Sequence, residues 1–169
     1  LIVLVGLAPA LTGAEELGRD RLPVFQIDAA DGTAISFGGR NDRPTVLLFW
    51  ATWCPYCRDL FPHIESVRAD YAARGVNFYA MNVWEDGDPE AYLAEHGYRM
   101  ALILGADLIA EDFGVHGTPG VIVADGNRHL LYKRERGEKP EDVERALRHA
   151  LDSSLADGEQ TPARSVGCR

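Results

Sequence analysis

Apolar and polar positions along the chain follow two different periods. Residues 45–50 (TVLLFW) and 76–83 (VNFYAMNV) are mostly apolar runs, which are typical of strands buried on both faces of a sheet. Between them, apolar side chains recur at spacings of three and four from Cys57 to Tyr71, the period of a helix with one buried face. The pattern therefore predicts a strand, a helix and a second strand in succession.

Shorter elements are predicted on either side of this unit. They are, in chain order, a β-hairpin around Asp31-Gly32 within residues 19–42, a helix from Pro89 to Gly97 capped by Asp88, a short strand at 101–104, a short helix at 107–113, a hairpin of residues 121–125 and 129–134, and a helix from Pro140. Alternating strands and helices followed by a hairpin predict an α/β fold with a mixed central sheet flanked by helices.

The two ends of the chain depart from these periods. Residues 1–11 (LIVLVGLAPAL) are almost wholly apolar and are followed by small residues. This stretch suits the apolar region of a signal peptide better than a complete membrane span, and an uncleaved anchor or a core element are the alternatives. We assign residues 1–18 to a signal peptide or anchor remnant, 19–153 to the folded domain, and 154–169 to a polar tail expected to be disordered.

Composition narrows the class of protein. The chain has 169 residues, 46% of them apolar, which is enough for one globular domain with a real core. Its net charge of −9 opposes a nucleic-acid partner. The chain has three cysteines, too few for a disulfide scaffold of the secreted type. Cys54 and Cys57 form a local pair, whereas Cys168 stands alone in the tail, where we expect a mobile thiol rather than a link to another protein.

The cysteine pair lies where the first apolar strand gives way to the helix. The start of a helix presents unpaired N–H groups and partial positive charge, which stabilise a thiolate. We expect Cys54 to be the exposed attacking thiol and Cys57, one turn later, to face the core and resolve a mixed disulfide. Pro55 suits the first helical turn, and Trp53 would shield the site and offer partners a flat apolar surface.

Two other interpretations of the pair are open at this point. The cysteines could be ordinary buried residues, or they could begin a zinc site. A zinc site needs four ligands, or three and a water molecule. The chain has no second Cys-x-x-Cys, and its five histidines do not pair at ligand spacing, so redox chemistry is favoured.

A second motif is GVHGTPG, residues 114–120, just before a predicted strand. An X-Pro bond in such a tight turn can be cis, but the Thr118-Pro119 dipeptide alone does not distinguish it from an ordinary trans turn.

Taken together, FWATWCPYC, Pro62 five residues after Cys57, and FGVHGTP resemble the thioredoxin superfamily. The early hairpin, the apolar N-terminus and MNVWED resemble its extracytoplasmic TlpA/ResA-like branch, and the resemblance covers residues 22–151. It implies a thioredoxin-like fold, with Cys54 as nucleophile and Cys57 as resolving thiol. It further implies that Trp53, Pro55 and Tyr56 support the site. Thr118 and Pro119 would form a cis-proline turn opposite the cysteines, whose backbone pairs with the substrate chain.

The chain departs from the family pattern where proton transfer is concerned. Leu48 stands where thioredoxins carry a buried acid, and Leu60 stands where ResA-like members often have a glutamate. Glu85 in MNVWE matches an acidic position of ResA-like members and is a candidate for proton transfer, although a solvated loop acid is equally compatible with the sequence. His116 is a weaker candidate, and His63 is expected to be exposed.

The favoured function is a thiol–disulfide oxidoreductase that acts on cysteine-containing exported proteins. By resemblance it would be a reductase of the type that serves cytochrome c or metal-site maturation in the bacterial periplasm, with no cofactor and with electrons from a membrane or periplasmic redox partner. The alternative of a disulfide-forming oxidase would use the same chemistry in the opposite direction. A peroxiredoxin-type peroxidase fits poorly, because Thr52 and Leu47 break its motif. A metal chaperone or redox sensor is the non-enzymatic alternative.

Overall fold

The computed structural model describes residues 21–38 and 43–159, so the predictions for residues 1–18 and for Cys168 lie outside the described residues. The elements, in chain order, are β1 (Phe25–Asp28), β2 (Ala34–Phe37), β3 (Thr45–Trp50), α1 (Pro55–Tyr71), a 3₁₀ turn (Ala72–Arg74), β4 (Asn77–Asn82), α2 (Pro89–His96), β5 (Ala101–Ile103), α3 (Asp107–Asp112), β6 (Gly120–Ala124), β7 (Leu130–Lys133) and α4 (Pro140–Glu159). This order confirms the one predicted from the sequence periods.

The strands form one mixed sheet and one separate hairpin. The sheet has the order β5-β4-β3-β6-β7, in which β3 runs parallel to β4 and antiparallel to β6. β1 and β2 pair with each other as the predicted N-terminal hairpin. β3 is central and all six of its residues are buried, because both faces of the sheet are covered. The predicted α/β fold with a mixed central sheet is confirmed.

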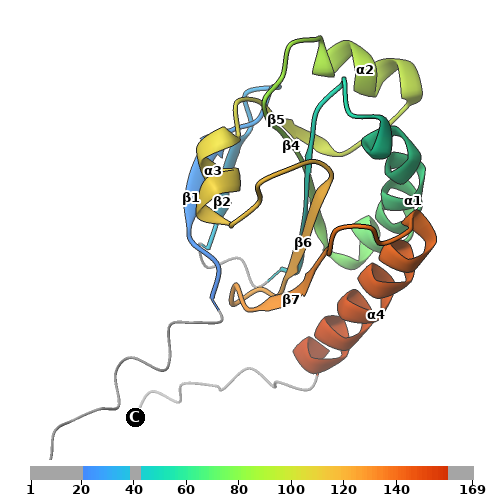
Figure 1. Ribbon diagram of the computed structural model, residues 1–169. Helices are drawn as coiled ribbons and strands as arrows, with labels where there is room; N and C mark the ends of the chain where they lie inside the picture. The colour runs from blue at the N-terminus through green and yellow to red at the C-terminus, as the bar shows by residue number, and fades with distance from the viewer. Residues whose placement is uncertain (1–20, 39–42, 160–169) are drawn as a thin grey trace, which may run out of the picture.

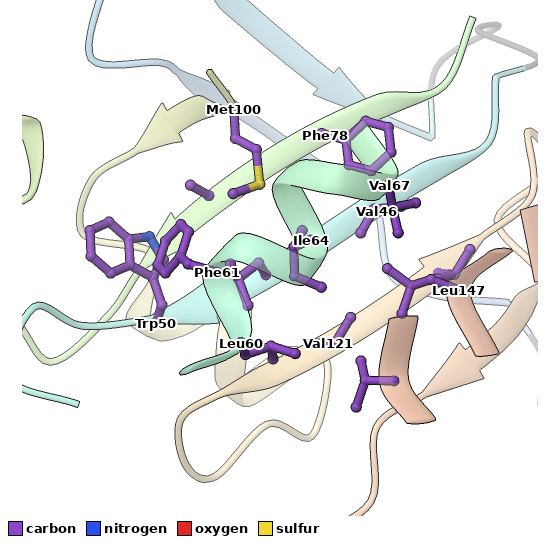
Figure 2. Packing of buried hydrophobic residues seen from close by; sticks show 14 of the residues in the cluster. Val46, Trp50, Leu60, Phe61, Ile64, Val67, Phe78, Met100, Val121 and Leu147 are labelled. Carbon is purple, nitrogen blue, oxygen red and sulfur yellow. The ribbon is translucent and has the colours of Figure 1, made fainter. Parts of the chain in front are cut away.

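Alternate residues of β3 serve two hydrophobic clusters. Val46, Leu48 and Trp50 belong to the cluster shared with α1 and α4, and the side chains between them belong to the cluster beneath the hairpin and α3. In Figure 1, α1 and α4 accordingly lie on one side of the sheet and α3 with the hairpin on the other. Figure 2 shows the first cluster, in which the Phe61 ring meets the Trp50 ring edge-on at a centroid distance of 4.8 Å.

The final helix is longer than the sequence predicted. α4 continues to Glu159, so the predicted disordered tail from residue 154 is wrong for its first six residues. The reason is packing, because Leu155 lies four residues after the buried Leu151 and continues its stripe against the α1 cluster. Within the described residues, no helix has both the length and the apolar content that crossing a membrane requires.

Polar side chains join α4 to α1 at the edge of this cluster. Arg148 contacts Asp70 at 2.7 Å, Glu144 at 2.9 Å and the hydroxyl of Ser66 at 3.0 Å. His63 lies 2.6 Å from Glu144 and is half-buried. The expectation that His63 is exposed is therefore wrong, because α4 covers the side of α1 on which it lies.

Arg148→Met should lower the free energy of unfolding by about 1 kcal/mol, because partly exposed ion pairs contribute a few tenths to one kcal/mol each and methionine keeps the apolar stem. Hydrogen bonding from His63, opposed by burial and helped by Arg148, holds the pKa of Glu144 below its usual value of 4.5. The difference in the free energy of unfolding between Arg148→Met and the wild type should therefore be present above about pH 4.5. It should shrink as the pH falls below that value. Urea unfolding at several pH values measures it.

Arg145→Met is the matched control, because the Arg145 side chain is 75% exposed and, among the described residues, pairs only with Asp142 three residues earlier. Equal losses for the two variants would contradict a stabilising role for the α1–α4 contacts.

Candidate active site

The cysteine pair forms a disulfide at the junction between β3 and α1. The Cα atoms of Cys54 and Cys57 are 5.3 Å apart, within the range of ordinary disulfides. Cys54 is the N-cap of α1, and its Sγ accepts a hydrogen bond from the Cys57 N–H at 3.2 Å. Pro55 occupies the first helical turn, where a missing N–H costs no intrahelical bond. In reduced protein, the same Cys57 N–H would stabilise a Cys54 thiolate.

Both sulfur-bearing residues are buried in this disulfide form. Cys54 is 2% exposed and Cys57 is 1% exposed, so the prediction of an exposed Cys54 is wrong. The reason is the capping geometry, which folds the Cys54 sulfur back over the first turn of α1 toward the Cys57 N–H. Exposure and cluster membership therefore do not distinguish the two cysteines, since both belong to the core cluster. Their positions on the helix do, because Cys54 is the N-cap of α1 and Cys57 lies within its first turn.

Large aromatic side chains are exposed around the buried disulfide. Tyr56, between the cysteines, is 70% exposed, and Trp53, just before them, is 48% exposed. The Trp53 Nε1–H donates to the backbone oxygen of Trp84 at 2.8 Å, and Trp84 is itself 37% exposed. Trp53 and Tyr56 thus present apolar surface beside the site, as expected for Trp53. The sequence reasoning missed Trp84, which stands at a φ of 49°, a backbone region that bulky residues seldom adopt.

The Thr118-Pro119 peptide bond is cis, as the family resemblance implied. Antiparallel pairing sets Phe49 of β3 opposite Gly120 of β6. Since β3 ends at Trp50 and runs on to Cys54, while Pro119 directly precedes β6, the cis turn and the disulfide lie at the same end of the sheet (Figure 1). Pro119 is buried and Thr118 is half-buried.

Glu85 lies in the loop after β4 and accepts five hydrogen bonds. The donors are the N–H and hydroxyl of Thr52, the side-chain amide of Asn82, and the N–H groups of Asp86 and Gly87. Burial raises the pKa of the Glu85 carboxyl, but the bonds from Thr52, Asn82 and Gly87 lower it more, so the pKa is about 2. The carboxylate is therefore ionised at neutral pH.

This arrangement bears on the proposed proton-transfer role of Glu85. A group with a pKa of about 2 and all its lone pairs engaged is a weak base, so the geometry favours a positioning role over proton transfer. Thr52 stands two residues before Cys54, so Glu85 ties the turn that carries Cys54 to the loop after β4. Leu48 and Leu60 lie buried in the main core, and His116, two residues before Thr118, is exposed.

The sequence reasoning missed the partners of Glu85. In the sequence, Thr52 bears only on a peroxidase motif, and no motif marks Gly87. A Cβ on Gly87 would collide with the Thr52 hydroxyl, so the loop closes on this turn only because residue 87 is glycine. No sequence signal links positions 52 and 85, because the contact joins the ends of two neighbouring strands. Within residues 21–38 and 43–159, no three His, Cys, Asp or Glu side chains are grouped so as to hold a metal ion.

A five-stranded mixed sheet, a helix that begins at a Cys-x-x-Cys disulfide and a cis-proline turn at the same sheet end together define a protein of thioredoxin-like fold. The family model described as Redoxin matches residues 18–149. The chain thus belongs to the Redoxin family of the thioredoxin superfamily, as the sequence motifs implied.

Similar proteins carry names of the same kind. The thiol:disulfide interchange protein DsbE of Escherichia coli K12 is 28% identical over 118 residues, which are 66% of this chain and 62% of that protein. The thiol:disulfide interchange protein HelX of Rhodobacter capsulatus is 34% identical over 109 residues, 62% of this chain and 58% of that one. The crystal structure of a putative DsbE from Chlorobium tepidum superposes with a TM-score of 0.69 at 27% identity, covering 80% of this chain and 96% of that chain. The chain therefore spans less than two thirds of the length of these two interchange proteins.

Proposed function

We propose that the protein is a thiol–disulfide oxidoreductase that exchanges disulfides with cysteine-containing exported proteins, and that it works as a reductase. The observation that carries this proposal is the Cys54–Cys57 disulfide at the N-terminus of α1, at the same sheet end as the Thr118-Pro119 cis turn. The relatives named as thiol:disulfide interchange proteins support the class of chemistry.

The exchange needs only the two thiols. The thiolate of reduced Cys54 attacks one sulfur of a client disulfide, whose S–S bond breaks as the Cys54–client bond forms, and the departing client thiolate takes a proton from water. The Cys57 thiol then gives its proton to water, and its thiolate attacks the Cys54 sulfur and displaces the second client sulfur, which is protonated in turn. Two electrons have passed to the client, whose disulfide is now two thiols.

The cycle requires a partner that restores the dithiol. An exported or membrane-bound protein with a dithiol of lower potential would return two electrons to the Cys54–Cys57 disulfide by the same exchange. The apolar residues 1–11 and the interchange proteins among the relatives support an extracytoplasmic, periplasmic setting for this cycle. Clients undergoing cytochrome c or metal-site maturation are the proposed substrate type.

The reduction potential of the Cys54–Cys57 pair should lie near or below about −250 mV, because reductases of this fold stabilise their disulfide relative to the dithiol. Equilibration of a Cys168→Ser variant with a dithiothreitol or glutathione couple measures this potential without the third thiol. A potential near about −120 mV would instead identify an oxidase. Absence of any reversible two-electron couple would overturn the oxidoreductase proposal and favour metal binding.

A further inference from the structure

A groove of about 360 Å³ adjoins the cis-proline turn. Its lining consists of residues 114–121, which include the turn itself, and of Lys133, Arg134 and Arg136 from the end of β7 and the loop that follows. Three permanent cations and His116 therefore meet in one groove, and among the described residues no carboxylate lines it. This concentration of positive charge contrasts with the net charge of −9 of the whole chain.

The cations are held in place by backbone oxygens. Arg134 donates from Nη1 to the Pro119 oxygen and from Nη2 to the Glu138 oxygen, both at 3.1 Å. Lys133 Nζ donates to the oxygens of Phe113 and Gly114 at 3.0 and 2.8 Å. Neutral oxygens leave these positive charges uncompensated, so the groove retains them for an incoming anion.

This cationic groove has donors to spare at its exposed end. Arg136 is exposed and contacts no polar partner within residues 21–38 and 43–159. The Nε of Arg134 also lacks a hydrogen-bond partner among the described residues, but it is buried and is not counted among these donors. The nearest acids in sequence are Glu135 and Glu138, and neither lines the groove. The Glu138 carboxylate instead accepts from the Tyr132 hydroxyl and the Glu135 N–H.

We propose that this groove binds an acidic side chain of the client, close in sequence to the client cysteine that Cys54 attacks. The inference rests on the proposed function, in which the client backbone lies along the turn at Thr118. From that turn the groove continues directly to Lys133, Arg134 and Arg136, so the residues that flank the client cysteine pass over the cations. A glutamate or aspartate there would meet the free donors, whereas a lysine would meet like charge and be rejected.

Three disulfide-bonded peptides test this preference. They differ only in the two residues after one cysteine, which are Glu-Glu, Gln-Gln or Lys-Lys. The rate at which each oxidises the reduced Cys168→Ser protein is followed by stopped-flow fluorescence. We expect the acidic peptide to react roughly tenfold faster than the neutral one at low salt, and the basic peptide to react more slowly still. The advantage should shrink in 0.5 M salt, because screening weakens attraction between exposed charges.

Arg136→Glu should bring the ratio of acidic to neutral rates to about one or below. Arg145→Glu is the matched control, because it makes the same change in net charge on an exposed face of α4, outside the groove, and should keep the wild-type ratio. Equal rates for the acidic and basic peptides, or equal ratios in the two variants, would overturn the proposal.

A second measurement separates this proposal from the proposed function. Peptides with serine in place of cysteine cannot exchange, but the acidic one should still bind the oxidised protein and shift the backbone NMR signals of residues 114–121. Binding of the acidic peptide without exchange of any cysteine peptide would overturn the proposed function and leave the groove assignment standing. No preference for the acidic serine peptide would overturn the groove assignment.

Discussion

Cys57→Ser should accumulate a covalent complex with a disulfide-containing client, which the wild-type protein releases. Without the second thiol, the mixed disulfide formed by Cys54 has no internal nucleophile to resolve it. Incubation of the reduced Cys57→Ser/Cys168→Ser variant with a disulfide peptide, followed by mass spectrometry under non-reducing conditions, measures the adduct. With a peptide dimer linked by one disulfide, the mass of the adduct should equal that of the protein plus one peptide chain. Dithiothreitol should release this chain.

Cys54→Ser in the same background is the matched control and should lower the exchange rate by at least about 10³-fold, because it removes the nucleophile. The remaining Cys57 is 1% exposed in the folded protein and lies within the core cluster. An adduct that forms on Cys57 in Cys54→Ser, but not on Cys54 in Cys57→Ser, would reverse the assigned roles.

Glu85→Ala should destabilise the protein by about 2 to 3 kcal/mol and slow exchange. The variant leaves the Thr52, Asn82 and Gly87 donors without their shared acceptor, and the pKa of about 2 against an ordinary 4.5 corresponds to a stabilisation of similar size. The pKa of Glu85 is lower in the folded protein than in the unfolded chain. This stabilisation is therefore present above about pH 4.5 and is lost as the pH falls toward 2. Denaturant unfolding from pH 7 to pH 3 should show the variant and wild type converging.

Asp86→Ala supplies the matched control, since Asp86 is the next acid in the chain and only its backbone N–H bonds Glu85. It should retain stability near the wild-type value. A positioning role for Glu85 also predicts that the Cys54–Cys57 exchange keeps its pH profile in Glu85→Ala while its rate falls. A displaced pH profile at unchanged stability would assign Glu85 to proton transfer instead.

The sequence was sufficient for the order of elements because each strongly periodic segment packs in one way. The TVLLFW run could only be a strand covered on both faces, and the stripe from Cys57 to Tyr71 only a helix on that strand. The sequence places the end of α4 too early, because Leu155 is the one large apolar residue of the polar stretch 152–159, and only its packing against the core shows that the helix continues.

Parts of the site were beyond sequence reasoning for a different reason. The two bonds from Thr52 to Glu85 join loops 33 residues apart, which no local pattern encodes. Burial of Cys54 follows from side-chain direction at the helix cap, which the motif leaves open. The cationic groove could have been found, because the predicted hairpin returns Arg134 to Val121, two residues from Pro119, and three of residues 133–136 (KRER) are basic.

Burial of the oxidised pair limits the rate at which small dissolved thiols can reduce it. A disulfide whose two residues are 2% and 1% exposed reacts with dissolved thiols only when the β3–α1 turn opens locally, so its encounter rate with small reductants scales with the open fraction. Such a pair is kinetically insulated from the surrounding thiol pool. In the proposed function, proteins that engage the site and open the turn would therefore exchange with the pair faster than small thiols do.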